Sequence, residues 1–136
     1  MAIAYLGLGS NEGDRQQYLH DALSLLTQRG VVVLKVSTFI ETKPVGGPPQ
    51  GLYLNGAAKI RTAHPPQKLL EIIKSIEYDL GRRPTVRNGP RPIDIDILLY
   101  EGVVLETPLL TIPHPRMNER DFVLIPLREI KPDEPQ

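Results

Sequence analysis

Cysteine is absent from the 136 residues of this chain, and neither sign of charge is in excess, with 16 lysines and arginines against 16 aspartates and glutamates. The lack of cysteine excludes a disulfide scaffold and any metal site built on thiolates. The neutral total argues against a dedicated DNA-binding module. No apolar run approaches the roughly 18 residues of a transmembrane helix, which excludes that class of protein. Aromatic residues make up only 5% of the chain.

The length of the chain predicts a single domain over residues 1–136. Area scaling predicts that roughly two thirds of the unfolded surface is buried on folding, which is enough for one core. The first four residues carry no basic segment, so we expect no signal peptide and a cytoplasmic protein. Proline is abundant, with 14 residues beside 11 glycines, and most of the prolines fall in three irregular segments, 43–51, 81–92 and 108–115.

Hydrophobic periodicity predicts alternating strands and helices over the rest of the chain. Strands are expected over 2–8, 31–42, 52–61 and 93–100, and amphipathic helices over about 15–28 and 66–80. A short strand near 103–105 and a short helix within 117–129 follow. The order is βαββαβ with a C-terminal short strand and helix. Two helices against a four-stranded, mostly antiparallel sheet form the ferredoxin-like α+β fold.

Asp94 and Asp96 are separated by one residue on the expected strand 93–100. The two-residue period of a strand puts both carboxylates on one face, about 7 Å apart. Two like charges at this distance repel each other unless a cation lies between them, and hard oxygen ligands favour Mg²⁺. The alternative interpretation is a solvent-facing strand edge whose charges prevent aggregation.

The segment before this strand is basic, because residues 81–92 contain Arg82, Arg83, Arg87 and Arg91 and no acid. Arginine forks suit phosphate oxygens, and Mg²⁺ bridges phosphates to carboxylates. The combination therefore predicts a site for a polyphosphate ligand. A solvated basic loop is the alternative, but a loop of this length inside a small domain is uncommon without a function.

Two more polar residues are candidates for ligand contact. Glu77 lies off the apolar stripe of helix 66–80, where it either binds a ligand or compensates Arg82. His114 stands between two prolines, and Arg120 follows six residues later. A lone histidine is more often structural than catalytic, but the nearby arginines favour a phosphate contact.

Tyr53 and Asn55 share the non-core face of the expected strand 52–61. An asparagine side chain offers a donor and an acceptor, as recognition of a heterocycle edge requires. Tyr53 and Phe122 lie near polar residues and suggest a stacking slot, although ordinary packing explains them equally well. The glycines at positions 7, 9 and 13 do not have the spacing of the dinucleotide fingerprint, and the chain has no P-loop motif.

Three blocks of sequence carry a resemblance to a known family. They are YLGLGSN over residues 5–11, NGPRPIDIDILLY over 88–100 and LTIPHPRMNERDFVLIPL over 110–127. The chain resembles the 6-hydroxymethyl-7,8-dihydropterin pyrophosphokinases of folate biosynthesis. The connecting lengths also match, so the resemblance covers nearly the whole chain. Its most specific part is the Gly-Pro-Arg loop that leads directly into a strand with two aspartates.

The resemblance implies transfer of a pyrophosphoryl group from ATP to the hydroxymethyl group of the pterin, with release of AMP. It implies Asp94 and Asp96 as ligands of two Mg²⁺ ions bound with ATP, and Arg82 and Arg91 as the other catalytic residues. Further nucleotide contacts are implied for Lys74, Glu77, Arg87, Ile97, Leu110, Thr111, His114 and Arg120. Pterin contacts are implied for Thr42, Pro44, Val45, Tyr53, Asn55 and Phe122. We expect a monomer whose partners are ATP and the pterin, with no nucleic acid and no membrane.

Two other functions compete with this hypothesis. A ferredoxin-like module that binds a nucleotide or another ligand without turnover would not need both aspartates and the arginines. A nucleic-acid-binding domain of this fold needs stacked aromatics on a central strand, where Asp94 and Asp96 would instead repel phosphates. For the enzyme, we also expect the arginine segment and the loop 43–51 to close over bound ATP and exclude water.

Overall fold

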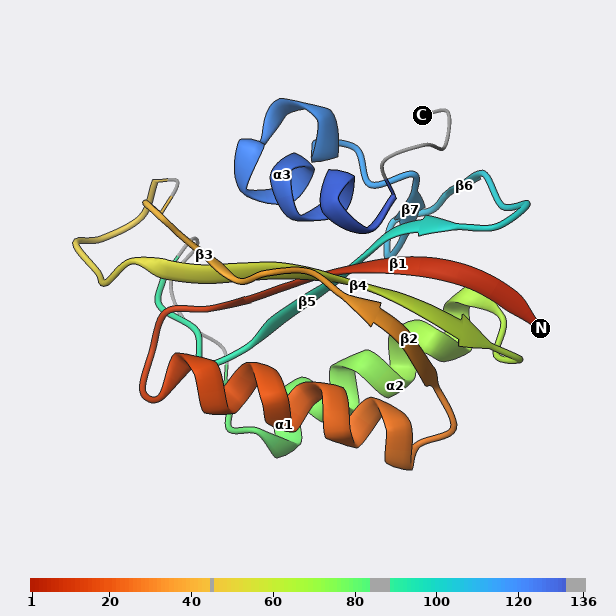
Figure 1. Cartoon of the computed structure of the whole chain (residues 1–136), viewed down its shortest axis with the longest axis horizontal. Coiled ribbons are helices and arrows are strands. Elements are labelled where there is room, and N and C mark those ends of the chain that lie inside the picture. Colours follow the sequence, from red (N-terminus) through yellow and green to blue (C-terminus); the bar gives the residue numbers. More distant parts are fainter. Residues whose placement is uncertain (45, 84–88, 132–136) are drawn as a thin grey trace.

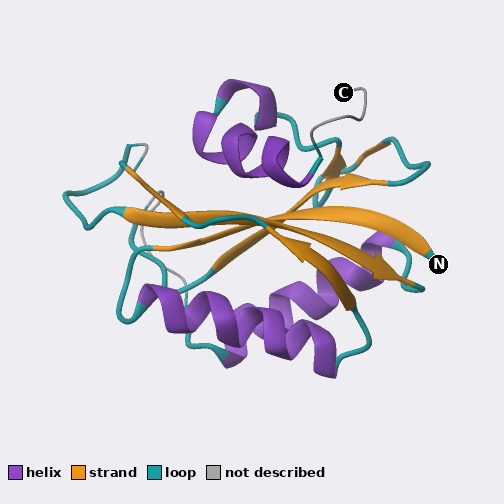
Figure 2. Cartoon of the chain, in the orientation of Figure 1, coloured by secondary structure: helices purple, strands orange, loops and turns teal. Residues whose placement is uncertain are grey.

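The computed structural model describes residues 1–44, 46–83 and 89–131, which form an antiparallel sheet with helices on both faces (Figures 1 and 2). In chain order the elements are β1 (Ala2–Ser10), α1 (Arg15–Gln28), β2 (Val32–Val36), β3 (Ile40–Thr42), β4 (Tyr53–Thr62), α2 (Pro66–Asp79), β5 (Asp94–Tyr100), β6 (Leu105–Glu106), β7 (Thr111–Ile112), the 3₁₀ turn η1 (Met117–Glu119) and α3 (Asp121–Ile130). The order confirms the predicted α+β class and the βαββαβ arrangement.

The sheet has the strand order β2-β4-β1-β5, and each neighbouring pair is antiparallel. The prediction of one continuous strand over 31–42 was wrong, because this segment divides into β2 and β3, which both pair with β4. At the break, Ser37 N donates to Ala57 O, and Ser37 Oγ accepts from Ala57 N. A Cβ on Gly56 would lie 2.5 Å from Phe39 Cδ1, so the glycine makes room for the ring where the chain leaves the ladder.

Two hydrophobic clusters lie on opposite faces of the sheet. Helices α1 and α2 cover one face, shown below the sheet in Figure 1, and α3 covers part of the other. The main cluster includes Leu6, Leu8, Leu19, Leu26, Ile60, Leu69, Ile73, Ile76, Ile95 and Ile97. The smaller cluster under α3 consists of Tyr5, Ala57, Leu98, Met117, Leu127 and Ile130. None of the helices in the described ranges has the length and apolar character needed to cross a membrane.

The C-terminal part differs from its prediction in detail. The short strand expected near 103–105 lies at β6, and it pairs with β7, which falls inside the segment 108–115 that we expected to be only a turn. The single helix expected within 117–129 is a 3₁₀ turn followed by α3, which contains Pro126. Its apolar side chains pack on β1 and β4, and this packing sustains the helix despite the missing amide of the proline.

Candidate functional site

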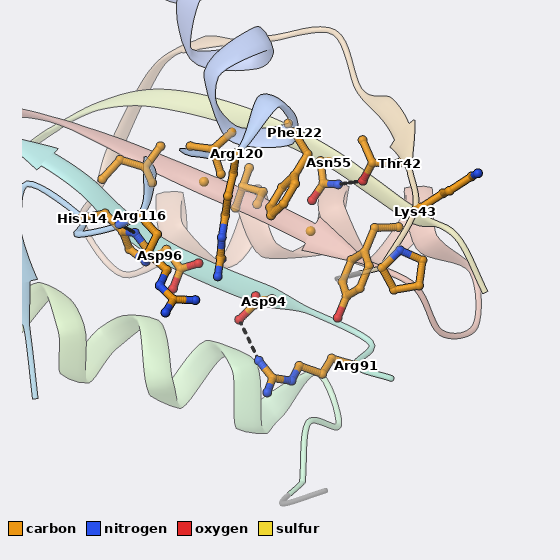
Figure 3. Close-up of a pocket in the computed structure, with 18 residues that line it drawn as sticks. Thr42, Lys43, Asn55, Arg91, Asp94, Asp96, His114, Arg116, Arg120 and Phe122 are labelled. Carbon is orange, nitrogen blue, oxygen red and sulfur yellow. Dashed lines mark hydrogen bonds and ion pairs between the residues drawn. The ribbon is translucent and has the colours of Figure 1, made fainter. Parts of the chain in front are cut away.

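A cavity of about 210 Å³ opens on the α3 face of the sheet (Figure 3). Five separate parts of the chain meet there: the strand β1, the end of β3 with the loop after it, the start of β4, the strand β5 with the residues before it, and the segment from β7 to α3. Its lining consists of Gly7, Leu8, Gly9, Thr42, Lys43, Pro44, Tyr53, Asn55, Gly56, Arg91, Asp94, Asp96, Leu98, His114, Arg116, Arg120, Phe122 and Val123.

Strand alternation explains why polar groups face this cavity. On β5, Ile95 and Ile97 enter the main core, and the alternate residues Asp94 and Asp96 line the cavity. The central strand β1 carries no side chain at the facing positions, because Gly9 pairs with Asp94 and Gly7 pairs with Asp96. The placement of both carboxylates on one face, expected from their spacing, is therefore what the structure has.

Asp94 belongs to a charged network beneath the cavity wall. Arg82 Nη1 donates to Asp94 Oδ1 at 2.9 Å and to Glu77 Oε2 at 2.6 Å. The same Glu77 oxygen accepts from the backbone N of Ile95 at 2.8 Å, and Lys74 Nζ lies 3.4 Å from Glu77 Oε1. Glu77 is only 3% exposed, and a buried charge needs partners. These contacts compensate its charge. Glu77 therefore compensates Arg82 and also ties α2 to the strand that carries the two aspartates.

Asp96 is partly buried next to these carboxylates. Burial, and after it the charges of Asp94 and Glu77, raise the pKa of Asp96 to about 7, against the lowering effect of Lys74 and Arg82. Both the loss of solvation and the neighbouring negative charges oppose the ionised form of this carboxyl group. A bound cation would relieve this repulsion.

The donor set fits Mg²⁺ held together with a phosphate ligand. Within the part of the chain that the structure describes, no three His, Asp or Glu side chains form a cluster that could hold a metal alone. Two carboxylates facing one cavity leave several ligand positions for water and phosphate oxygens, which is the usual way proteins bind Mg²⁺. Asp94 and Asp96 are the residues that would hold the ion.

Positive charge surrounds the carboxylates. Arg91 Nη1 lies 3.7 Å from Asp94 Oδ1, and Arg91 Nε is buried and has no hydrogen-bond partner among the described residues. Arg116 and Arg120 line the cavity from the opposite side, as Figure 3 shows. A buried guanidinium nitrogen without an acceptor is a place where an anionic ligand would bind.

His114 is held in place by its backbone and its ring. The backbone N–H of His114 donates to Leu98 O at 2.9 Å, and the ring Nδ1 accepts from the backbone N of Arg116 at 3.3 Å. Burial lowers the pKa of His114, and the charge of Arg120 lowers it further, against the raising effect of Asp94. The neutral ring, with Nδ1 accepting, can donate from Nε2 to a ligand.

The other end of the cavity is lined by aromatic side chains. Tyr53 and Phe122 line it together with Pro44, and burial raises the pKa of Tyr53, with a further contribution from Asp94. Asn55 Nδ2 donates to Thr42 Oγ1, a contact drawn in Figure 3. This end can stack on a flat ring and bind its edge, while the other end can bind phosphate.

Not all of the expected site residues line this cavity. Arg82, Glu77 and Lys74 reach it only through the network around Asp94. The Ile97 side chain is in the main core, Leu110 packs against that core, and Thr111 pairs with Glu106 in the small β6–β7 sheet. Val45 and Arg87 lie outside the described residues.

The sequence interpretation did not include eight of the residues that line the cavity: Gly7, Leu8, Gly9, Lys43, Gly56, Leu98, Arg116 and Val123. If the expected strand 2–8 is extended to residue 10, its alternation places Gly7 and Gly9 on the face opposite the core residues Leu6 and Leu8. Nothing local in the sequence indicates that Lys43 and Arg116, 73 positions apart, lie at one cavity.

Asn11 connects two of the loops that border the site. Its Nδ2 donates to Gln50 Oε1 at 2.7 Å and to Gly51 O at 3.2 Å, and its Oδ1 accepts from Arg91 N at 2.8 Å. Its own backbone N donates to Arg91 O at 3.1 Å. The side chain therefore fixes the end of the loop 43–51 relative to Arg91.

The fold is shared with a solved protein of known class. The chain matches, with a TM-score of 0.72 and 16% identity, a structure described as an HPPK-DHPS in complex with substrates, over 98% of this chain and 41% of that one. At this identity the match establishes the fold alone, that of a protein containing the domain abbreviated HPPK.

Comparison of sequences identifies the family. The chain is 53% identical over 129 residues to the 2-amino-4-hydroxy-6-hydroxymethyldihydropteridine pyrophosphokinase of Bacillus subtilis, covering 94% of this chain and 77% of that protein. It is 47% identical over 133 residues to the protein of the same name from Aquifex aeolicus, covering 98% and 82%. Residues 5–132 match the family described as 7,8-dihydro-6-hydroxymethylpterin-pyrophosphokinase (HPPK). The chain belongs to this family, which confirms the resemblance.

Some relatives are much longer proteins. The folic acid synthesis protein fol1 of Schizosaccharomyces pombe is 48% identical over 132 residues, which are 96% of this chain and 18% of that one. In such proteins the region similar to this chain is one part of a larger polypeptide.

Proposed function

We propose that this chain transfers the intact pyrophosphoryl group of ATP to the hydroxymethyl group of 6-hydroxymethyl-7,8-dihydropterin, in the biosynthesis of tetrahydrofolate. Membership of the family supports the reaction. The observation that carries the proposal is the cavity itself, which joins a pair of carboxylates and several arginines to an aromatic end. A ligand with a polyphosphate and a ligand with a flat ring would meet between these two ends.

The nucleotide half of the site consists of the carboxylates and the cations around them. Asp94 and Asp96 would hold two Mg²⁺ ions, which neutralise charge on the β- and γ-phosphates and make the attacking hydroxyl more acidic. Arg91, with its buried Nε, and Arg120 would bind phosphate oxygens, and His114 would donate a hydrogen bond from Nε2. Arg82 would hold Asp94 in position through the contact at 2.9 Å.

The pterin half consists of Tyr53, Phe122, Asn55 and Thr42. The two aromatic side chains would stack on the ring, and the Asn55 amide, oriented by Thr42, would bind its edge. The hydroxymethyl group would then point toward the carboxylates, which brings its oxygen in line with the β-phosphorus. Such positioning, together with neutralisation of the phosphate charge, supplies most of the rate enhancement in phosphoryl transfer.

The reaction balances without a covalent intermediate on the protein. A bond forms between the hydroxymethyl oxygen and the β-phosphorus, and the bond from the β-phosphorus to the oxygen bridging to the α-phosphate breaks. AMP leaves with that electron pair, and the hydroxyl proton is released. We further propose that residues 1–136 act as a single-domain monomer in the cytoplasm, which light scattering and cell fractionation would test.

The proposal is tested by measuring AMP formation in the presence of ATP, Mg²⁺ and the pterin. AMP is expected only when all three are present, and the Asp96→Ala variant should lose at least about 100-fold in kcat, since one metal ligand is removed. Glu106→Ala is the matched control, because Glu106 is an exposed acid on a strand outside the cavity. Ligand binding without AMP would instead favour a non-catalytic binding module.

A further inference from the structure

The central strand β1 has two glycines on the face that lines the cavity, Gly7 and Gly9. Glycine weakens a strand because it loses more backbone freedom on folding and packs no side chain. Neither residue has the positive φ that would require a glycine, in contrast to Gly13, where φ is 70°. The remaining reason for a glycine is a lack of space above the strand, which differs between the two positions.

The space above Gly9 is the more restricted of the two. Gly9 pairs with Asn55 on one side and with Asp94 on the other. A Cβ on Gly9 would lie 2.7 Å from Asn55 Oδ1 and 3.4 Å from Tyr53 Cδ1. A Cβ on Gly7 would meet only the Leu98 side chain, at 3.4 Å or more, which is ordinary contact.

The Asn55 side chain cannot easily move away from such a Cβ. It is 7% exposed, and its Nδ2 donates to Thr42 Oγ1, so its amide has a defined orientation. In this orientation Oδ1 lies above Gly9 and can accept a hydrogen bond from a group lying on the strand. A methyl group on Gly9 would either cover this oxygen or force the amide out of its contact with Thr42.

We infer that Gly9 is a specificity-determining residue, whose missing side chain lets an N–H at the edge of a flat heterocycle lie on β1 and donate to Asn55 Oδ1. The inference rests on the proposed function, which supplies a pterin as the heterocycle. In this arrangement the ring lies on the backbone of β1, between Asn55 on β4 and Asp94 on β5.

The test compares Gly9→Ala with Gly7→Ala by titration with 6-hydroxymethyl-7,8-dihydropterin in the presence of a non-hydrolysable ATP analogue and Mg²⁺. Gly9→Ala should raise the Kd of the pterin by about 10- to 100-fold, because it covers a buried acceptor, and Gly7→Ala should raise it by a much smaller factor. The affinity for the ATP analogue alone and the thermal transition show that each variant is folded. Equal losses in the two variants would overturn the inference, because they would point to strand weakening in general.

A double-mutant cycle with Asn55→Ala makes the test independent of folding effects. Once the amide is gone, the methyl group of Gly9→Ala has room, and its effect on the Kd of the pterin should fall to about threefold or less. A full additional loss in that background would overturn the inference. Pterin binding without AMP formation by the wild-type chain would contradict the proposed function, while the affinities would still decide the role of Gly9.

Discussion

Replacing Asp96 by asparagine should stabilise the metal-free protein while it removes a metal ligand. In the folded chain the pKa of Asp96 is raised to about 7 by burial and by the charges of Asp94 and Glu77. An ionised Asp96 is therefore unfavourable in the folded state without a cation. Asparagine has nearly the same shape and carries no charge, so it relieves this repulsion.

The size of the effect follows from linkage between protonation and folding. The pKa of this carboxyl is about 7 in the folded chain and 3.8 as a reference for the unfolded chain. Because the folded state holds the proton more tightly, the free energy of unfolding falls as the pH rises from about 4 to about 7. Above pH 7 the loss is complete, and we expect it to be about 2–4 kcal/mol.

Urea denaturation with EDTA present, at pH 4.5 and pH 8, measures this difference. Asp96→Asn should exceed the wild type in free energy of unfolding by about 2–4 kcal/mol at pH 8, and by only about 1 kcal/mol or less at pH 4.5. Addition of Mg²⁺ and an ATP analogue should reverse the order, because only the wild type binds them tightly. A variant that is less stable than the wild type at pH 8 would refute the reasoning.

Two further substitutions test the contacts around the site. Glu77→Gln should lower the free energy of unfolding by about 2 kcal/mol in urea denaturation, because Arg82 and the Ile95 amide lose a charged acceptor; an unchanged midpoint would show that the network contributes nothing. Asn11→Asp should speed proteolysis within the loop 43–51, because a carboxylate cannot donate to Gly51 O. Gln16→Glu, which adds the same charge at an exposed helical position, is its control, and equal cleavage in both variants would contradict the proposed role of Asn11.

Much of the fold was predictable because its signals are local. The apolar stripes of α1 and α2 and the alternation on β5 depend on neighbouring residues, and their bounds agree with the structure to within about a turn. The break between β2 and β3 was not predictable, because it depends on Phe39 packing against Gly56, 17 positions away. Residues 31–42 are rich in strand formers on both sides of the break, so the sequence pattern alone favours one strand.

The site, like the fold, was predictable only where its signals are local. The period of a strand was enough to place Asp94 and Asp96 together over the cavity. The role of Gly9 depends on the register of three strands and on the orientation of the Asn55 amide, which no local pattern specifies. The nucleotide contact implied for Ile97 stays a prediction, because the structure shows only that its side chain lies in the main core.

The most direct test of the central claim follows the β-phosphorus of ATP. With ATP labelled at this position, Mg²⁺ and 6-hydroxymethyl-7,8-dihydropterin, the label should appear in the pterin product, in amounts equal to the AMP released. The Asp96→Ala variant should form neither product at a comparable rate. Label retained in ADP while a single phosphate is transferred, or AMP released without the pterin, would contradict the assignment of this cavity to pyrophosphoryl transfer.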